Sequence, residues 1–209
     1  MGMTAAKLVR FPSGDDLAAA SETLAPGLFE ACQAGDRLAL EKLFLSVAPR
    51  VYRWAVLLGL SAEDAEDAAQ DALAIAARRF ARCSAEAALT TWLFQITRRV
   101  VANSRRSAWV RRVFRSADGA NNEPAFDDVS RADTEHELSV RRCFRRLSRG
   151  HAEVLLLADV EGYTRVEISR ILGVPEGTVA SRLRLAREAF RLRWEALAVI
   201  PTLAEGGGS

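Results

Sequence analysis

Three arginines lie close together near the end of the chain, at Arg182, Arg184 and Arg187. Arginine guanidinium groups make paired hydrogen bonds to phosphates and to guanine edges, so this segment could bind DNA. The residues before them, Thr164–Gly173, have the pattern of a shorter helix that ends at a glycine turn. A short helix, a turn and an arginine-rich helix predict a helix-turn-helix, whose second helix lies in the DNA major groove. The alternative is an ordinary antiparallel helix pair with a solvated basic face.

Local signals mark both helices of this motif. Thr164 and Glu167 fit a capping box that would begin the first helix. Gly173 fits the turn, where a positive φ costs glycine no steric strain, and Pro175 stands where the second helix would begin. The apolar face predicted for the second helix consists of Val179, Leu183, Ala186 and Phe190.

A second arginine-rich segment combines arginines with aromatic residues and is predicted to be a helix from Thr91 to about Arg115. No acidic residue falls between Ala87 and Ala117. Unpaired bases stack on aromatic rings while arginines contact the backbone, so this combination favours single-stranded nucleic acid. The alternative is that Trp92 and Phe94 belong to the core and that the arginines form a solvated face.

An acidic helix is predicted from Ser61 to about Phe80, with Ser61 and Asp64 in a second capping box. Asp64, Asp67 and Asp71 recur at i, i+3 and i+7, which places them on one side of a helix. Such a face would repel the phosphates of DNA. Two explanations stay open: a basic protein partner, or an N-terminal turn in which the helix dipole favours acids.

The sequence offers no recognisable chemistry for catalysis. It contains no nucleophile–base pair, phosphate-binding loop or metal-ligand cluster, so we expect no enzymatic activity, no cofactor and no metal. Cys32, Cys83 and Cys143 lie far apart and form no C-x-x-C pair. Cys143 falls on an apolar helical line and is expected to be a buried thiol. An enzyme or redox sensor built on a lone cysteine lacks any partner motif.

The elements that must position these residues are all helical. With 49% hydrophobic and 27% charged residues the composition is that of a globular protein, and helical periodicity without strand alternation predicts an all-α fold. We expect two small helical domains joined by a flexible linker, the C-terminal one a helix-turn-helix. The predicted parts are a tail at 1–27, a first domain at 28–115, a linker at 116–133, a second domain at 134–198 and a tail at 199–209.

Further elements are expected inside these parts. Helices are predicted at Leu40–Leu58 and His151–Val160, and a loop at Ala81–Thr90. The N-terminal tail could hold a short helix near Asp16–Leu24. No apolar run is long enough to cross a membrane and no secretory signal is recognisable, which predicts a cytoplasmic protein without membrane insertion.

Three motifs in this order resemble a known family. Asp64–Asp71, Thr91–Arg98 and Gly173–Leu183 resemble the polymerase-docking, promoter-melting and minus-thirty-five segments of bacterial RNA polymerase sigma factors of the extracytoplasmic-function (ECF) group, in the sigma-70 family. The resemblance covers about Leu28–Leu197. The family often has an asparagine where Arg99 stands, an acid at the position of Asn103 and a basic residue at that of Ala180.

The resemblance implies a sigma factor that gives RNA polymerase promoter specificity and helps to open promoter DNA. It implies three partners: the RNA polymerase core, promoter DNA in duplex and melted form, and an anti-sigma factor. A stand-alone helix-turn-helix regulator that binds duplex DNA is the alternative, but it would need neither the acidic helix nor the tryptophan–arginine helix.

The resemblance also implies roles for individual residues. The loop Ala81–Thr90 would capture a flipped minus-ten base. The implied core-polymerase contacts are Asp64, Asp67, Gln70 and Asp71. The implied minus-ten contacts are Trp92, Arg98, Arg99, Asn103 and Arg106. The implied minus-thirty-five contacts are Glu176, Thr178, Ser181, Arg182, Arg184 and Arg187.

Overall fold

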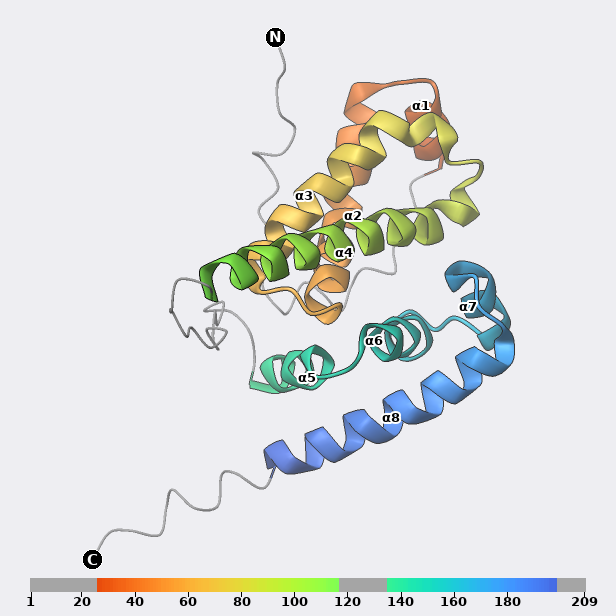
Figure 1. Cartoon of the computed structure of the whole chain (residues 1–209). Coiled ribbons are helices and arrows are strands. Elements are labelled where there is room, and N and C mark those ends of the chain that lie inside the picture. Colours follow the sequence, from red (N-terminus) through yellow and green to blue (C-terminus); the bar gives the residue numbers. More distant parts are fainter. Residues whose placement is uncertain (1–25, 117–134, 199–209) are drawn as a thin grey trace, which may run out of the picture. The chain divides into compact units, whose positions relative to one another are not determined.

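Every regular element of the described residues is a helix, so the prediction of an all-α fold is confirmed (Figure 1). The computed structural model describes residues 26–116 and 135–198. They form two compact units, of which the first holds most of residues 26–116 and the second holds residues 135–198. Both predicted tails, the helix expected near Asp16–Leu24 and all of the predicted linker except Ser116 lie outside the described residues.

The first unit consists of four α-helices and two short 3-10 turns. The helices are α1 (Leu28–Gln33), α2 (Arg37–Leu57), α3 (Ala62–Arg79) and α4 (Leu89–Ser116). The turns, Phe80–Arg82 and Glu86–Ala88, connect α3 to α4. The predicted loop Ala81–Thr90 was therefore too long, because Leu89 and Thr90 already belong to α4. Ser116 also belongs to α4 and not to the linker.

The core of the first unit centres on Trp54 and Phe94. Both side chains are fully buried, and their rings meet edge to face with centroids 5.4 Å apart. Helix α3 packs along α4 (Figure 1) through a face of small residues. The buried residues of α3 are Ala65, Ala68, Ala69, Ala72 and Ala76, together with the larger Leu73. Small side chains allow close approach of two helices, and they leave the acidic residues of α3 on its other side.

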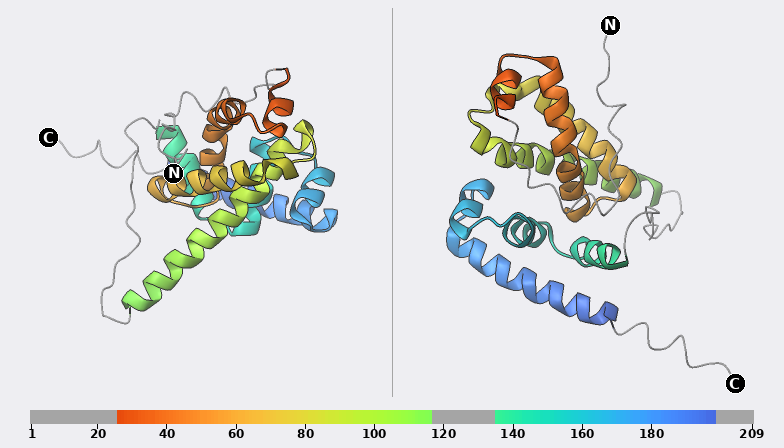
Figure 2. Two further views of the ribbon diagram at one scale, coloured as in Figure 1. Left: turned by 90° about the horizontal axis from the view of Figure 1, so that it is seen from above. Right: turned by 180° about the vertical axis from the view of Figure 1, so that it is seen from behind.

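The second unit consists of α5 (Glu135–Arg145), α6 (Arg149–Leu155), a π-helical turn (Leu156–Val160), α7 (Arg165–Leu172) and α8 (Glu176–Ala198). The predicted helix His151–Val160 therefore begins earlier, after the N-cap Ser148, and its second half is the π-helical turn. Helix α8 packs against α5, α6 and α7 along one long face (Figure 2). Val179 and Ala186 are fully buried on this face and Leu183 is buried.

Aromatic rings complete the contact between α5 and α8. Phe144 of α5 lies 5.6 Å from Phe190 of α8, and Phe190 stacks on Trp194 at 6.1 Å. His136 lies 5.1 Å from the ring of Trp194. Cys143 is buried beside this cluster on α5, as the apolar line in the sequence indicates.

The capping box at Thr164 is present in full. The Glu167 carboxylate accepts the Thr164 N–H at 2.8 Å, and Thr164 Oγ1 accepts the Glu167 N–H at 3.3 Å. Gly173 ends α7 with φ 67°, in the left-handed region that favours glycine. These contacts fix the start and the end of the first helix of the helix-turn-helix. Hydrogen bonds from Thr164 also lower the pKa of the Glu167 carboxyl.

Thr164→Ala is expected to destabilise the second unit by about 1 kcal/mol, because the Glu167 N–H loses its side-chain acceptor. Thr164 Oγ1 also donates to the Glu167 carboxylate at 2.7 Å, the main cause of the lowered pKa of Glu167, and the variant lacks this bond. The stability that this bond contributes is fully present above the ordinary pKa of about 4.3 and is lost as the pH falls through the lowered pKa. The deficit of the variant should therefore shrink at acid pH. Thermal unfolding at several pH values checks this. The control is Ser139→Ala in the middle of α5, and an equal loss in this variant would contradict the capping role.

Candidate nucleic-acid and protein interfaces

The residues of the acidic face of α3 differ in their exposure and in their hydrogen bonds. Asp67 and Asp71 are exposed and lie one helical turn apart, and Gln70 beside them is half-buried. Asp64 instead belongs to the helix cap: the Ser61 hydroxyl donates to its carboxylate at 2.8 Å and accepts its backbone N–H at 3.1 Å. Asp67 and Asp71 therefore present charge outward, whereas the Asp64 carboxylate accepts a hydrogen bond within the helix cap.

Four of the five residues predicted for the minus-ten element form one line along α4. Trp92, Arg99, Asn103 and Arg106 follow each other at steps of seven, four and three residues, which keeps them on one side of the helix. Trp92 is half-buried and the other three are exposed. Arg98 lies roughly a third of a turn away from this line. The structure thus brings four of them together and sets Arg98 apart.

The two aromatic residues at the start of α4 differ in role. Phe94 belongs to the core, as the alternative interpretation of this helix held. Trp92 is only half-buried, and its ring meets Phe80 edge to face at 6.1 Å. Trp92 is therefore partly accessible at the end of the α4 line.

Ser181 and Arg184 lie at the centre of the exposed face of α8, opposite the buried Val179 and Ala186. The Arg184 side chain is 71% exposed and forms a loose ion pair with Glu188 at 3.7 Å. An exposed pair of this kind adds little to stability, which leaves the guanidinium available for another partner. Of the other predicted residues of this face, Glu176 is exposed and Thr178 is half-buried.

Two of the predicted minus-thirty-five residues contact their own domain. Arg187 donates two hydrogen bonds to the Asp159 carboxylate, at 2.6 and 3.1 Å, and these raise the pKa of its guanidinium. A Cβ placed at Gly150 would lie 3.6 Å from the Arg182 guanidinium, so this group rests on the start of α6. Arg182 and Arg187 thus connect α8 to the preceding elements.

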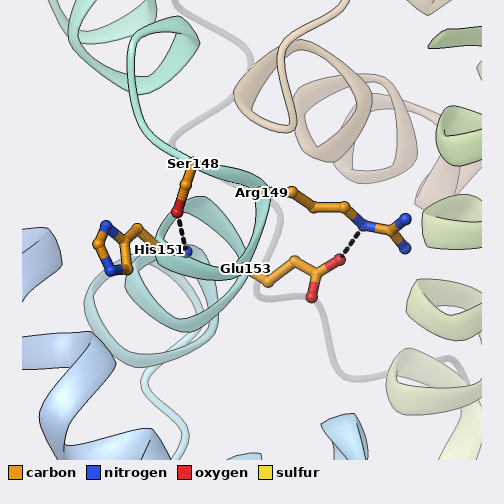
Figure 3. Close-up of polar contacts among 4 residues, drawn as sticks. All are labelled: Ser148, Arg149, His151 and Glu153. Atoms are coloured by element: carbon orange, nitrogen blue, oxygen red, sulfur yellow. Dashed lines mark hydrogen bonds and ion pairs between the residues drawn. The ribbon is translucent and has the colours of Figure 1, made fainter.

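The start of α6, which receives Arg182, is shown in Figure 3. Ser148 Oγ accepts the backbone N–H of His151 at 3.4 Å, and Arg149 Nε donates to Glu153 Oε1 at 2.7 Å (Figure 3). Sequence reasoning missed Ser148 and Asp159. Serine is one of the preferred N-cap residues, so Ser148, directly before α6, could have been recognised as the N-cap of this helix. Asp159 gave no local signal, because its partner lies 28 residues later.

The three cysteines are free, buried thiols, and desolvation raises the pKa of each. Burial of this kind favours the neutral thiol, which is a poor nucleophile. Among the described residues, no three potential ligand side chains are grouped so that they could hold a metal ion. None of the helices in residues 26–116 and 135–198 is long and apolar enough to span a membrane.

Comparison with protein families gives two matches on this chain. The sigma-70 region 2 model matches residues 43–111, and the sigma-70 region 4 model matches residues 137–190. The ECF RNA polymerase sigma factor SigM of Mycobacterium tuberculosis is 32% identical over 160 residues, which cover 77% of this chain and 79% of the relative. SigL of the same organism is 31% identical over 170 residues, covering 79% of this chain and 94% of the relative.

Two solved structures share the fold. The sigma factor RpoE, crystallised with the anti-sigma factor NepR from Bartonella quintana, superposes with a TM-score of 0.61 at 24% identity. It covers 74% of this chain and 96% of its own. CnrH, in complex with the cytosolic domain of CnrY, gives a TM-score of 0.60 at 20% identity and covers 81% of this chain and 96% of its own.

Proposed function

Because the chain belongs to the ECF group of the sigma-70 family of RNA polymerase sigma factors, we propose specific surfaces for its three contacts in transcription initiation. The acidic face of α3 docks on the polymerase core, the α4 line binds the melted minus-ten strand, and the exposed face of α8 binds the minus-thirty-five duplex. One observation carries this proposal: neighbouring helices of one unit, α3 and α4, present an acidic face and an aromatic–basic line.

The assignment of α3 rests on charge. Asp67 and Asp71 are exposed carboxylates, which would repel DNA phosphates but attract a basic protein surface. Both lie beyond the first turn of α3, so a favourable interaction with the helix dipole does not account for them. A basic segment of the polymerase core is the partner that fits this face.

The assignment of α4 rests on the line from Trp92 to Arg106, which spans about 21 Å at 1.5 Å per residue. A half-exposed indole offers a stacking surface for an unpaired base, and Arg99 and Arg106 offer charge to the backbone. Extruding a base from a duplex costs a few kcal/mol, which stacking and phosphate contacts could offset. Arg98 lies off this line, so of the five residues it has the least support for a contact with the minus-ten strand.

The assignment of α8 rests on the difference between its arginines. Arg184 and Ser181 face outward, whereas Arg182 and Arg187 are held against the domain. In a helix-turn-helix the residues near the start of the second helix reach the base edges. We therefore assign base or phosphate contact to Ser181 and Arg184, and positioning of α8 to Arg182 and Arg187.

An anti-sigma factor is the proposed regulator. RpoE and CnrH, which share this fold, were both solved as complexes, RpoE with the anti-sigma factor NepR and CnrH with the cytosolic domain of CnrY. A partner that covered α3, α4 or α8 would block the polymerase or the promoter, and removal of the partner would free them. The protein would then act where the polymerase acts, in the cytoplasm, and would catalyse no reaction of its own.

Run-off transcription on a library of promoter fragments tests the proposed function. Purified core polymerase is assayed with and without this protein. Specific transcripts that require the protein would support a sigma factor and reveal its promoter. Tight binding of the protein alone to a duplex site, with no transcripts, would favour the stand-alone regulator instead.

Arg184→Ala is expected to weaken promoter binding by about 1–3 kcal/mol, because α8 loses its most outward guanidinium. The affinity of the holoenzyme for a selected promoter, titrated at fixed salt, measures this. The matched control is Arg191→Ala, which removes the same charge two turns further along α8 from a guanidinium paired with Glu195 at 2.9 Å. Equal losses in both variants would indicate a general effect of charge and contradict the assignment.

A further inference from the structure

The segment between α3 and α4, residues 80–88, depends on contacts from elsewhere for its conformation. Within it, the backbone closes only short turns, from Cys83 N–H to Phe80 O at 2.8 Å and from Ala88 N–H to Ala85 O at 3.0 Å. Ser84, Ala85 and Glu86 are exposed, while Phe80 and Cys83 are buried. The segment thus has an outer side that could receive a ligand and an inner side that is anchored.

The anchor on the inner side comes from α1. The side-chain amide of Gln33 donates to Cys83 O at 2.6 Å and to Phe80 O at 3.3 Å. One side chain therefore holds both ends of the first turn, across 50 and 47 residues of sequence. Amide–carbonyl bonds of this length fix the orientation of the two peptide groups that accept them.

A cluster of aromatic rings connects α1 and the 80–88 segment to the α4 line. Phe29 of α1 lies 5.4 Å from Phe80, and Phe44 of α2 lies 6.3 Å from it on the same cluster. Phe80 in turn meets Trp92 edge to face at 6.1 Å. A continuous set of contacts therefore connects α1 to the first residue of the α4 line.

We propose that Gln33 and Phe29 of α1 are positioning residues that set the base preference of the 80–88 segment and Trp92 at the minus-ten element. The inference rests on the proposed function, in which an unpaired base stacks on Trp92, and it adds that the adjoining 80–88 segment lines the same base site. Selection of one base requires a site held to within about 0.5 Å, which depends on the residues behind it. Both residues precede the region 2 match, which begins at residue 43, so the family comparison does not cover them.

Two substitutions of Gln33 separate the hydrogen bonds from the packing. Gln33→Met keeps the length of the side chain and removes the donor, and Gln33→Glu replaces the donor by a carboxylate facing two carbonyl oxygens. The control is Glu30→Gln on the same helix, at an exposed position. Because Gln33 is itself exposed at the end of α1, both variants should stay folded at the assay temperature, which thermal unfolding checks.

The experiment is run-off transcription by the full-length protein with core polymerase, on a promoter library randomised at the minus-ten and minus-thirty-five elements. Each Gln33 variant should reduce the ratio of preferred to other bases about tenfold at one minus-ten position. Preference at the minus-thirty-five positions, core affinity and the control variant should be unchanged.

Other outcomes overturn the inference in distinguishable ways. Unchanged base ratios in both variants would show that the Gln33 hydrogen bonds do not set the preference. An equal loss of transcripts from all promoters, with unchanged base ratios, would show that Gln33 only supports the fold. If the parent protein itself gave no specific transcripts with core polymerase, the proposed function would fail first and the inference would fall with it.

Discussion

Reversing the charge of the two exposed aspartates of α3, by Asp67→Arg and Asp71→Arg, is expected to abolish binding to the polymerase core and leave the protein folded. The two side chains lie one turn apart on an exposed face, so the variant presents a basic face where an acidic one stood. Placing like charges against each other across an interface costs several kcal/mol. Arginine is a good helix former and neither position belongs to the cap, so α3 should keep its structure.

The measurement is the affinity of labelled protein for purified core polymerase at fixed salt, together with thermal unfolding. A matched control makes the same change in net charge at two exposed acids elsewhere in the first unit, by Glu30→Arg and Glu41→Arg. The control should bind the core much as the parent protein does. If the α3 variant kept the core affinity of the parent, the docking surface would lie elsewhere.

Features that short stretches of sequence encode were predictable. The capping box at Thr164, the glycine turn at Gly173 and the buried face of Val179 and Ala186 each depend on residues within two or three turns of one another. Helical period alone could also have separated Arg98 from the line of Trp92 and Arg106, because all three sit on one helix. That distinction was missed although the signal was present.

Contacts between distant segments could not be predicted in this way. The pairing of Arg187 with Asp159 joins residues 28 apart, and the Gln33 amide reaches carbonyls about fifty residues away. Nothing in the local pattern of Gln33 indicates those acceptors, since they are backbone groups of a segment without helical period. The site residues that sequence supplies are thus those on helix faces, and the residues that hold them in place come from the tertiary fold.

Trp54→Ala is expected to destabilise the first unit by about 3–5 kcal/mol. Trp54 is fully buried, and its removal leaves a cavity beside Phe94, 5.4 Å away between ring centroids. Small domains are stable by about 5–15 kcal/mol, so this loss takes away a large part of the total. The control is Leu38→Ala on the same helix, where the side chain is 69% exposed and its truncation should cost little.

The same variant tests whether the two units are separately stable. The ring of Phe144 is buried in the second unit and lies against the half-buried Phe190, so this unit has a core of its own between α5 and α8. Calorimetry of Trp54→Ala should then show one transition moved to lower temperature and one unchanged. The variant should lose transcription with the polymerase core but bind a minus-thirty-five duplex as the parent protein does. α8 and its supports Asp159 and Gly150 all belong to the second unit. A shift of both transitions to lower temperature would therefore show that the stability of the second unit depends on the first. A loss of duplex affinity would show the same dependence for minus-thirty-five recognition.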